Sequence, residues 1–115
     1  MDCIFCKIIN KEMPAEVLHE TQDVVIIRDI RPSAPIHYMV VSRRHLVSIA
    51  DMQVSDEALL GHMVHAAKEG AEKLGLAGYK LVFNVGRDGG QIIDHIHLHL
   101  LGGWGHGDQK KIITN

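Results

Sequence analysis

The chain has 115 residues, of which 46% are hydrophobic and 23% charged, and its formal net charge is −2 at pH 7. This length suits one domain spanning residues 1–115, and the apolar fraction excludes wholesale disorder or a collagen-like fibre. The small negative charge argues against a general electrostatic attraction to nucleic acid or to a membrane.

Two further features of the composition set expectations about location and chemistry. No apolar run approaches the roughly 20 residues of a membrane helix, and the first residues lack the pattern of a signal peptide. A cytoplasmic location is therefore expected. The chain has nine histidines but only two Phe, two Tyr and one Trp, which is an unusual excess of imidazole.

The first third of the chain is expected to contain a short helix followed by strands. Apolar residues recur at helical spacing within residues 3–11, which predicts a short amphipathic helix. Residues 16–19 and 24–28 have the composition of strands and are joined by a polar turn. Two prolines make residues 29–35 a loop, and residues 37–42 form the next expected strand.

The clearest helical pattern lies in residues 55–74, where apolar side chains recur with helical spacing. Ser55 is the expected N-cap, and Gly75 is placed to end the helix. Gly61 and Gly70 weaken the helical propensity slightly.

Two more strands are expected after this helix, at residues 79–85 and 95–101, with a glycine-rich loop at residues 86–90. Strands thus occur before and after one long helix. This order predicts an α+β domain with a five-stranded antiparallel sheet, one long helix and one short helix, rather than a βαβ array.

Residues 95–101 alternate histidine with apolar side chains, in the order His-Ile-His-Leu-His-Leu-Leu. Successive side chains of a strand point to opposite faces, so the pattern predicts three imidazoles together on one face. Imidazole can serve as a nucleophile, acid, base or metal ligand near pH 7. Two other interpretations are a polar outer face that happens to use histidine, and a three-histidine zinc site with an open position.

The same residues match the histidine-triad motif, His-φ-His-φ-His-φ-φ, in which φ is apolar. The chain resembles the histidine triad nucleotide-binding branch of the histidine triad (HIT) superfamily along nearly its whole length. The matching segments are Ile4-Phe5-Cys6-Lys7-Ile8-Ile9, Pro14-Ala15, Asp29-Ile30, Pro32, Ala34-Pro35, His37, Leu59-Leu60-Gly61-His62, Gly78-Tyr79, Asn84, Gly89-Gly90-Gln91 and Gly102-Gly103.

The resemblance implies a HIT-like fold that pairs as a homodimer into a longer sheet. It also implies a protein that binds purine nucleoside monophosphates and hydrolyses phosphoramidate or related bonds at the α-phosphorus. His97 would be the nucleophile that forms a covalent nucleotidyl-histidine, His99 would contact the phosphate, and His37 and His95 would orient the nucleophile. Neutral imidazole suits such an attack.

The resemblance also assigns the nucleotide-binding residues. Asn84, Gly90 and Gln91 would contact the phosphate together with His97 and His99, and Asp29 would accept from the ribose hydroxyls. The base pocket would be lined by four apolar residues: Phe5, Ile8, Ile27 and Ile30. Plain core packing is the alternative for those four.

Two positions depart from the family pattern. Ile92 stands where many relatives carry a small hydroxyl residue that helps the leaving atom, and isoleucine cannot donate a hydrogen bond. Asp94 stands where an aromatic residue usually precedes the first triad histidine. Both changes bear on turnover and on the leaving group, whereas the nucleophile and the phosphate site are unaffected.

Cys3 and Cys6 form a second motif, Cys-x-x-Cys. A pair with this spacing can bind zinc, form a redox couple or consist of buried thiols, and the absence of a βαβ unit disfavours a thioredoxin-type site. In relatives that carry the pair, zinc is completed by two histidines, here His45 and His95. The resemblance therefore implies a structural zinc ion held by Cys3, Cys6, His45 and His95.

Three functions are carried forward: a phosphoramidate hydrolase, a nucleotide-binding protein with little turnover, and a dinucleotide polyphosphate hydrolase. His99 disfavours the nucleotidyltransferase branch, which has glutamine at that place. Four histidines receive no role: His19, His62, His65 and His106. The tail from Trp104 to Asn115 matches relatives poorly, so its effect on specificity stays open.

Overall fold

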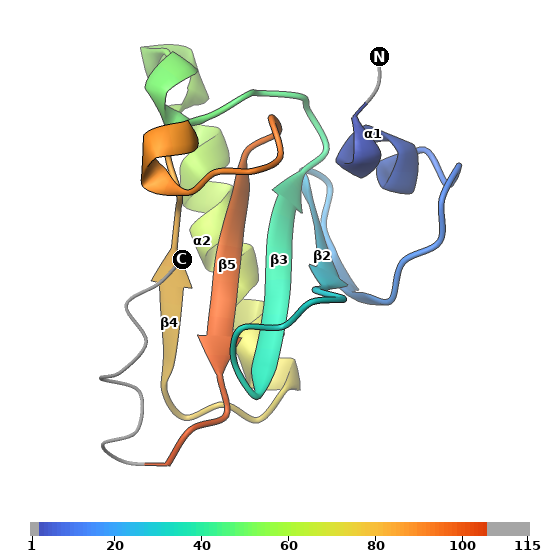
Figure 1. The fold of residues 1–115 in the computed structure, drawn as a ribbon, viewed down its shortest axis with the longest axis vertical. Helices are drawn as coiled ribbons and strands as arrows, with labels where there is room; N and C mark the ends of the chain where they lie inside the picture. The colour runs from blue at the N-terminus through green and yellow to red at the C-terminus, as the bar shows by residue number, and fades with distance from the viewer. Residues whose placement is uncertain (1–2, 106–115) are drawn as a thin grey trace.

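A five-stranded antiparallel sheet with one helix on each face forms the domain in the computed structural model, which describes residues 3–105 (Figure 1). The strand order is β1-β2-β3-β5-β4, which confirms the predicted α+β class. The helices and strands are α1 (Ile4–Ile9), β1 (Val17–Glu20), β2 (Val24–Arg28), β3 (Ile36–Ser42), α2 (Glu57–Lys73), β4 (Tyr79–Val82) and β5 (His97–Gly102).

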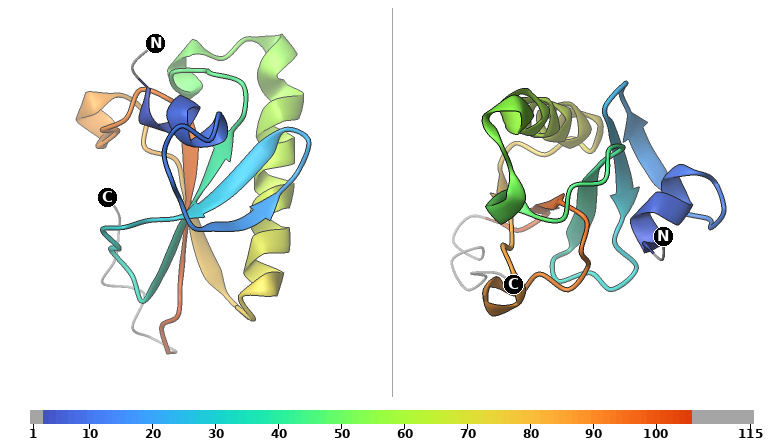
Figure 2. Two further views of the ribbon diagram at one scale, coloured as in Figure 1. Left: turned by 90° about the vertical axis from the view of Figure 1, so that its right-hand side faces the viewer. Right: turned by 90° about the horizontal axis from the view of Figure 1, so that it is seen from above.

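One face of the sheet is covered by α2, as Figure 2 shows. The core on this side contains side chains of β2, β3 and β5 packed against three residues of α2, namely Met63, Ala66 and Ala67. Small residues on the helix allow it to approach the strands closely, and every member of this cluster is at most 2% exposed.

The opposite face carries α1, which packs over β2 and β3. Phe5 is buried there with Val25, Ile27 and Val41. Strand β2 is therefore buried on both faces, which explains why its first four residues form an uninterrupted apolar run instead of an alternating one. The face of the sheet that carries α1 also carries the histidines of β5, because His97 pairs with Val41.

The start of the long helix differs from the sequence prediction. Residues Val54–Asp56 form a 3-10 turn, α2 begins at Glu57, and Ser55 is not its N-cap. The buried Asp56 carboxylate accepts the backbone N–H of Gln53 at 2.8 Å and also pairs with Arg44. An aspartate that serves both groups satisfies more donors than the Ser55 hydroxyl could, which explains the shift.

The end of α2 follows the prediction. Gly75 has φ +70, in the left-handed region that favours glycine, and Leu76 N–H donates to the carbonyl of Ala71.

The two glycines inside α2 predict opposite effects of substitution. A Cβ added at Gly61 would meet nothing within 4 Å, whereas one at Gly70 would lie 2.8 Å from Ile26 Cδ1, which is held in the core. We expect Gly61→Ala to raise the free energy of unfolding by about 0.5–1 kcal/mol through helix propensity. Gly70→Ala is expected to lower it by about 1 kcal/mol through overpacking. Urea unfolding of both variants checks this, and equal shifts of the same sign would refute it.

Strand β5 is shorter than predicted, because it starts at His97 and not at His95. The ladder between β3 and β5 ends at the pair Val41–His97. Beyond it, the carbonyl of Ser42 accepts a hydrogen bond from the His95 ring at 2.7 Å, and Ile96 N–H donates to the carbonyl of Leu46. A side-chain bond and a loop carbonyl thus replace the next rungs of the ladder.

The other boundaries shift by a few residues. Strand β1 runs one residue later than predicted at each end, and β4 ends at Val82 instead of Val85. Strand β5 lies between β3 and β4, so β4 becomes an edge of the sheet.

Within residues 3–105, no helix is both long and apolar enough to cross a membrane.

Candidate functional site

Four side chains from distant parts of the chain converge at the carboxyl end of β3. Cys3 precedes α1, Cys6 lies in α1, His45 follows β3 and His95 precedes β5. Their two sulfur atoms and two Nδ1 atoms all lie within 4.8 Å of one another. The structure thus brings together all four residues that the sequence predicted as metal ligands.

The protonation of His95 is set by its surroundings. Its Nε2–H donates to the carbonyl of the buried Ser42 at 2.7 Å, so the neutral ring has its lone pair on Nδ1. That Nδ1 points at Cys3 Sγ (3.3 Å) and Cys6 Sγ (3.6 Å). A backbone carbonyl that fixes the tautomer of a metal-binding histidine is a common supporting contact in metal sites. No side-chain pattern in the sequence could have indicated this role of Ser42.

The spacing within the cluster suits a tetrahedral metal ion. Bonds of about 2.3 Å to sulfur and about 2.05 Å to nitrogen place tetrahedral S and N ligands about 3.6 Å apart, and two N ligands about 3.4 Å apart. The observed Sγ···Nδ1 distances are 3.3, 3.4 and 3.6 Å, and the two Nδ1 atoms of His45 and His95 are 3.1 Å apart. Two thiols and two imidazoles are also the ligand types that zinc prefers.

His97 lies beside this cluster on the same face of the sheet and is 7% exposed. Its Nδ1–H donates to the carbonyl of His95 at 2.7 Å, which leaves the lone pair on Nε2. Burial lowers the pKa of His97, and the hydrogen bond to His95 and the charge of Asp29 offset this only in part. The structure thus presents a neutral imidazole whose free nitrogen can act as a nucleophile.

His99 and His37 form a hydrogen-bonded pair next to His97. The backbone N–H of Ser33 donates to His37 Nδ1 at 2.9 Å, so neutral His37 carries its proton on Nε2. That Nε2 lies 2.9 Å from His99 Nδ1, which must accept the bond. Neutral His99 therefore keeps a free Nε2–H donor. Burial, reinforced by the neighbouring histidines, lowers the pKa of His99 to about 4.

The same reasoning excludes a metal ion from the second group of potential ligands, Asp29, His37 and His99. His37 Nε2 lies 3.4 Å from Asp29 Oδ2, but it presents an N–H group and not a lone pair to both partners. Binding a metal would require breaking the bond from Ser33 or forming an imidazolate. This group is consequently a hydrogen-bonded chain of proton donors and acceptors that supports His99.

Among the residues predicted to contact ribose and phosphate, Asp29 lies next to this pair of histidines. Asp29 Oδ1 accepts the N–H of Arg31 at 2.8 Å, while its other oxygen faces His37. Ile30 is 90% exposed and follows Asp29 in the loop. Asn84 follows the end of β4 by two residues, and the one hydrogen bond that its side chain makes within residues 3–105 is a long contact, 3.4 Å, to the carbonyl of Gly90. Its amide is thus free to turn toward a ligand.

The four predicted base-pocket residues do not share one environment. Phe5 and Ile27 are 2% and 3% exposed and belong to the core beneath α1. Ile8 packs against the same core and also lines a separate cavity of about 410 Å³ between α1 and β1. Ile30 is the one of the four that is fully exposed. Core packing thus accounts for Phe5 and Ile27 in this structure.

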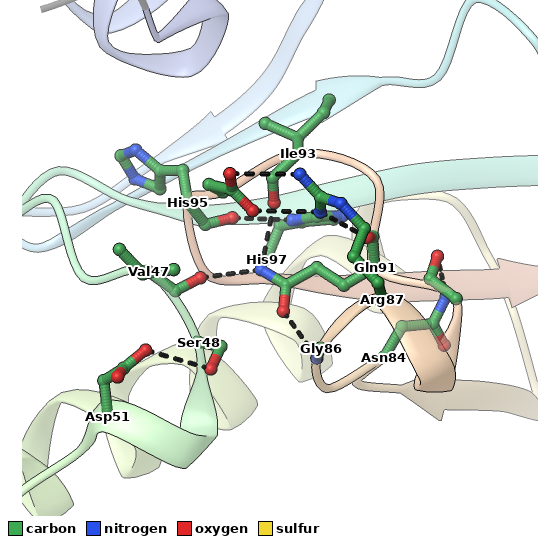
Figure 3. Close-up of polar contacts among 12 residues, drawn as sticks. Val47, Ser48, Asp51, Asn84, Gly86, Arg87, Gln91, Ile93, His95 and His97 are labelled. Atoms are coloured by element: carbon green, nitrogen blue, oxygen red, sulfur yellow. Dashed lines mark hydrogen bonds and ion pairs between the residues drawn. The ribbon is translucent and has the colours of Figure 1, made fainter.

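Gln91 supports the loop that follows β4, as its contacts in Figure 3 show, and Gly90 lies in the same loop. The Gln91 side chain is 3% exposed, accepts the N–H of Gly86 at 3.0 Å and donates to the carbonyls of Val47 and Ile93. The backbone N–H groups of Gly90 and Gln91 donate to carbonyls within the loop. A phosphate would have to compete with these bonds, so the direct roles predicted for Gly90 and Gln91 stay predictions.

The two departures from the family pattern have different structural settings. Asp94 forms a two-pronged ion pair with Arg87, at 2.9 and 3.1 Å, and Arg87 also donates to the carbonyl of Gln91 at 2.6 Å. These contacts hold the two ends of the loop together just before His95. Ile92 is 82% exposed and has an apolar surface toward solvent. Sequence reasoning missed the Arg87–Asp94 pair, because six residues of loop lie between the partners.

Three of the remaining histidines, His19, His62 and His65, pair with acidic side chains away from the site. His62 Nδ1 is 2.8 Å from Asp23, and His19 Nε2 is 3.1 Å from Glu69, which also lies 3.8 Å from His65. His106 falls outside the described residues, as does the tail after residue 105. These contacts agree with the expectation that His19, His62 and His65 need no catalytic role.

Comparisons with known proteins place this site in a family. Residues 2–112 match the family described as "Scavenger mRNA decapping enzyme C-term binding". An uncharacterized HIT-like protein of Synechococcus elongatus is 40% identical over 103 residues, which cover 89% of this chain and 90% of that protein. The chain belongs to the HIT family.

Solved HIT structures agree in fold. The crystal structure of a HIT family hydrolase from Legionella pneumophila is 45% identical, with a TM-score of 0.87 over 90% of this chain and 95% of that one. A zinc-bound histidine triad family protein from Mycobacterium smegmatis is 29% identical, with a TM-score of 0.79 over 95% of this chain and 79% of that one. The arrangement of strands described above is therefore a HIT fold.

The buried histidines of this HIT protein predict a fall in stability on acidification. The pKa values of His37 and His99 are lowered by burial, so below pH 6.5 the unfolded chain binds more protons than the folded one. The free energy of unfolding is thus at its full value above about pH 6.5, and it falls progressively as the pH is lowered toward 4. For His99 we expect a loss on the order of 2 kcal/mol. Urea unfolding between pH 7.5 and 4.5 measures it, and His99→Gln should flatten the curve, whereas the exposed His62→Gln should not.

Proposed function

We propose that this protein hydrolyses purine nucleoside phosphoramidates, or related nucleotidyl bonds, through a covalent nucleotidyl-His97 intermediate. The observation that supports this most directly is the tautomer of His97, whose Nδ1–H is held by the His95 carbonyl at 2.7 Å while Nε2 stays free. A buried, neutral and oriented imidazole is what attack on phosphorus near pH 7 requires.

The proposed reaction has two displacements. His97 Nε2 forms a bond to the α-phosphorus as the P–N bond of the phosphoramidate breaks, and the amine leaves with a proton from solvent. Water then attacks the same phosphorus and loses a proton to solvent. The bond to His97 breaks, and the nucleoside monophosphate is released. The His99 Nε2–H and the Asn84 amide would donate to the phosphate oxygens, where negative charge builds up in each transition state.

The remaining contacts would orient the nucleotide. Asp29, which has one oxygen turned toward His37, would accept from the two ribose hydroxyls. His37 would hold His99 through its Nε2–H, and His95 would hold His97 through its carbonyl. Ile30 is exposed beside Asp29 and would cover the base, which suits an apolar contact with a purine ring.

A zinc ion bound by Cys3, Cys6, His45 and His95 is part of this proposal. The donor set, the distances and the tautomer of His95 all fit such an ion, and the zinc-bound relative has the same fold. A closed site with four protein ligands would supply structural stability and no catalytic water.

The proposed location is cytoplasmic. Cys3 and Cys6 form no disulfide, which fits a reducing compartment.

A homodimer that joins two sheets is also proposed, with β4 as the joining strand. Strand β4 is an edge of the sheet, and two of its four residues, Tyr79 and Leu81, are both 37% exposed. An edge strand with apolar residues is a favourable place for pairing with a second chain.

A nucleotide-binding protein with little turnover is the second candidate. The exposed Ile92 supplies no hydroxyl to the leaving atom, and the N–H groups of Gly90 and Gln91 are already engaged within the loop. If this candidate is right, calorimetry will detect nucleotide binding without turnover, and Ile92→Ser will raise the rate.

The substrate class is tested by a panel of three compounds: an adenosine phosphoramidate, a dinucleotide polyphosphate and a sugar nucleotide. We expect the phosphoramidate to have the highest kcat/KM and the dinucleotide to be the next candidate. Trapping of a nucleotidyl adduct on His97, located by mass spectrometry of peptides, would support the covalent route. Hydrolysis without any adduct and independent of His97 would contradict it.

A further inference from the structure

Six rings form a continuous series from the cysteine–histidine cluster to the pair that faces Asp29. Successive ring centroids lie 4.8, 5.7, 5.1, 5.0 and 5.1 Å apart. The rings belong, in this order, to His45, His95, Phe5, His97, His99 and His37. Phe5 is the member without a titratable or metal-binding atom, and it joins the rings on the cluster side to those on the nucleophile side.

Phe5 is placed by the same helix that supplies the two cysteines. It lies between Cys3 and Cys6 in the sequence and is 2% exposed. Its ring meets His95 at an angle of 89° and His97 at 67°, both in edge-to-face geometry. Edge-to-face contact is the favoured packing of aromatic pairs, and it restrains the orientation of both rings.

The His97 ring has three restraints. Its Nδ1–H bond to the His95 carbonyl fixes one end of the ring, but a single hydrogen bond permits the ring to tilt about that bond. Phe5 and His99 contact the ring at 67° and 73° and oppose this tilt. The direction of the free Nε2 thus depends on Phe5 as well as on the backbone.

The position of Phe5 depends in turn on what holds α1 to the sheet. A helix of six residues is too short to be stable by itself. It is attached through the cysteine–histidine cluster and through the apolar side chains Phe5, Ile8 and Ile9. Release of the two cysteines from the cluster would leave only the apolar contacts.

We infer that Phe5 is a positioning residue that carries the state of the Cys3–Cys6–His45–His95 cluster to the imidazole of His97. When the cluster holds its ion, α1 is fixed and Phe5 keeps Nε2 of His97 in one direction. When the ion is lost, α1 and Phe5 loosen, and the nucleophile loses its alignment without any change in its chemistry. This inference rests on the proposed function and assigns a regulation to the same site.

The test combines kinetics with side-chain NMR of ¹⁵N-histidine-labelled, zinc-loaded protein. Phe5→Leu conserves most of the apolar volume but removes the ring edge. We expect kcat for an adenosine phosphoramidate to fall about 10-fold, within the range that misplacement of a reacting group produces, with KM changed less than about twofold. The ring signals of His97 should shift or broaden, and the same change should follow removal of zinc from the unaltered protein.

Ile9→Ala is the matched control, because Ile9 lies in the same helix and core cluster and has no aromatic ring contact among the described residues. In the zinc-loaded protein the cluster still holds α1, so Ile9→Ala should lower Tm while leaving kcat and the His97 signals unchanged. A raised KM with unchanged kcat in Phe5→Leu would make Phe5 a wall of the base pocket and overturn the inference. So would a lower Tm alone, with the His97 signals intact.

The NMR arm separates this inference from the proposed function. If the protein hydrolyses none of the nucleotides, the proposed activity fails, yet the response of the His97 ring to Phe5→Leu and to zinc removal can still be read. A His97 ring that is insensitive to both changes overturns the inference even if the protein is an active hydrolase.

Discussion

Replacing His97 by alanine should reduce kcat for the proposed phosphoramidate hydrolysis by at least about 1,000-fold, because the variant has no atom to form the proposed covalent intermediate. Nucleoside monophosphate binding should change by less than about threefold, since the variant keeps His99, Asn84 and Asp29, and the binding energy is expected to come from many contacts. Stopped-flow or coupled assays give kcat, and isothermal calorimetry gives Kd.

Two controls keep this result interpretable. His62→Ala removes an exposed histidine of α2 that pairs with Asp23, and should leave kcat unchanged. His99→Ala should reduce kcat less than His97→Ala does, because it removes a hydrogen-bond donor and not the nucleophile. A His97→Ala protein that folds normally and retains the activity of the unaltered chain would eliminate the covalent mechanism.

Removal of the proposed zinc ion should have the largest effect on stability. With free zinc at about 1,000 times its Kd, binding to the folded state contributes about 4 kcal/mol. For a domain of this size that corresponds to a fall in Tm of about 15 °C when a chelator is added. Protein purified without chelator should contain about one zinc ion per chain. Cys3→Ser and His45→Ala should each abolish this content and lower Tm.

The matched variants for this experiment are again exposed histidines that are not ligands. His62→Ala should keep both the zinc content and the response to chelator. Protein that contains no metal, and whose Tm responds neither to chelator nor to added zinc, would show that the cluster is held by hydrogen bonds and packing alone.

The fold was largely predictable from local patterns. The apolar run of β2, the helical spacing in α2 and the glycine at position 75 indicate their structures without help from distant residues. Errors arose where a distant partner decided the outcome. Arg44, which lies 12 residues before Asp56, moved the N-cap from Ser55 to Asp56, because Asp56 binds that guanidinium together with the backbone N–H of Gln53.

The candidate site shows the same division. The alternation of residues 95–101 correctly indicated that His97 and His99 share a face, since both extend from one strand. His95 is outside the strand, and its role comes from contacts with Ser42, Cys3 and Cys6 that no spacing could reveal. The apolar residues expected around a base differ in their exposure to solvent. Phe5 and Ile27 are buried and Ile30 is exposed, because burial depends on how α1 packs against the sheet.

The sequence by itself determined the fold class and the shared face of His97 and His99, because these follow from side-chain periodicity, whereas the four candidate metal ligands came from the family resemblance. Only the tertiary structure decided which nitrogen of each imidazole carries the proton. That choice depends on the carbonyls of Ser42 and His95 and on the N–H of Ser33, which meet the rings only when the chain is folded. The contacts with Ser42 and with the His95 carbonyl leave lone pairs on Nδ1 of His95 and Nε2 of His97, the atoms proposed to bind zinc and to attack phosphorus.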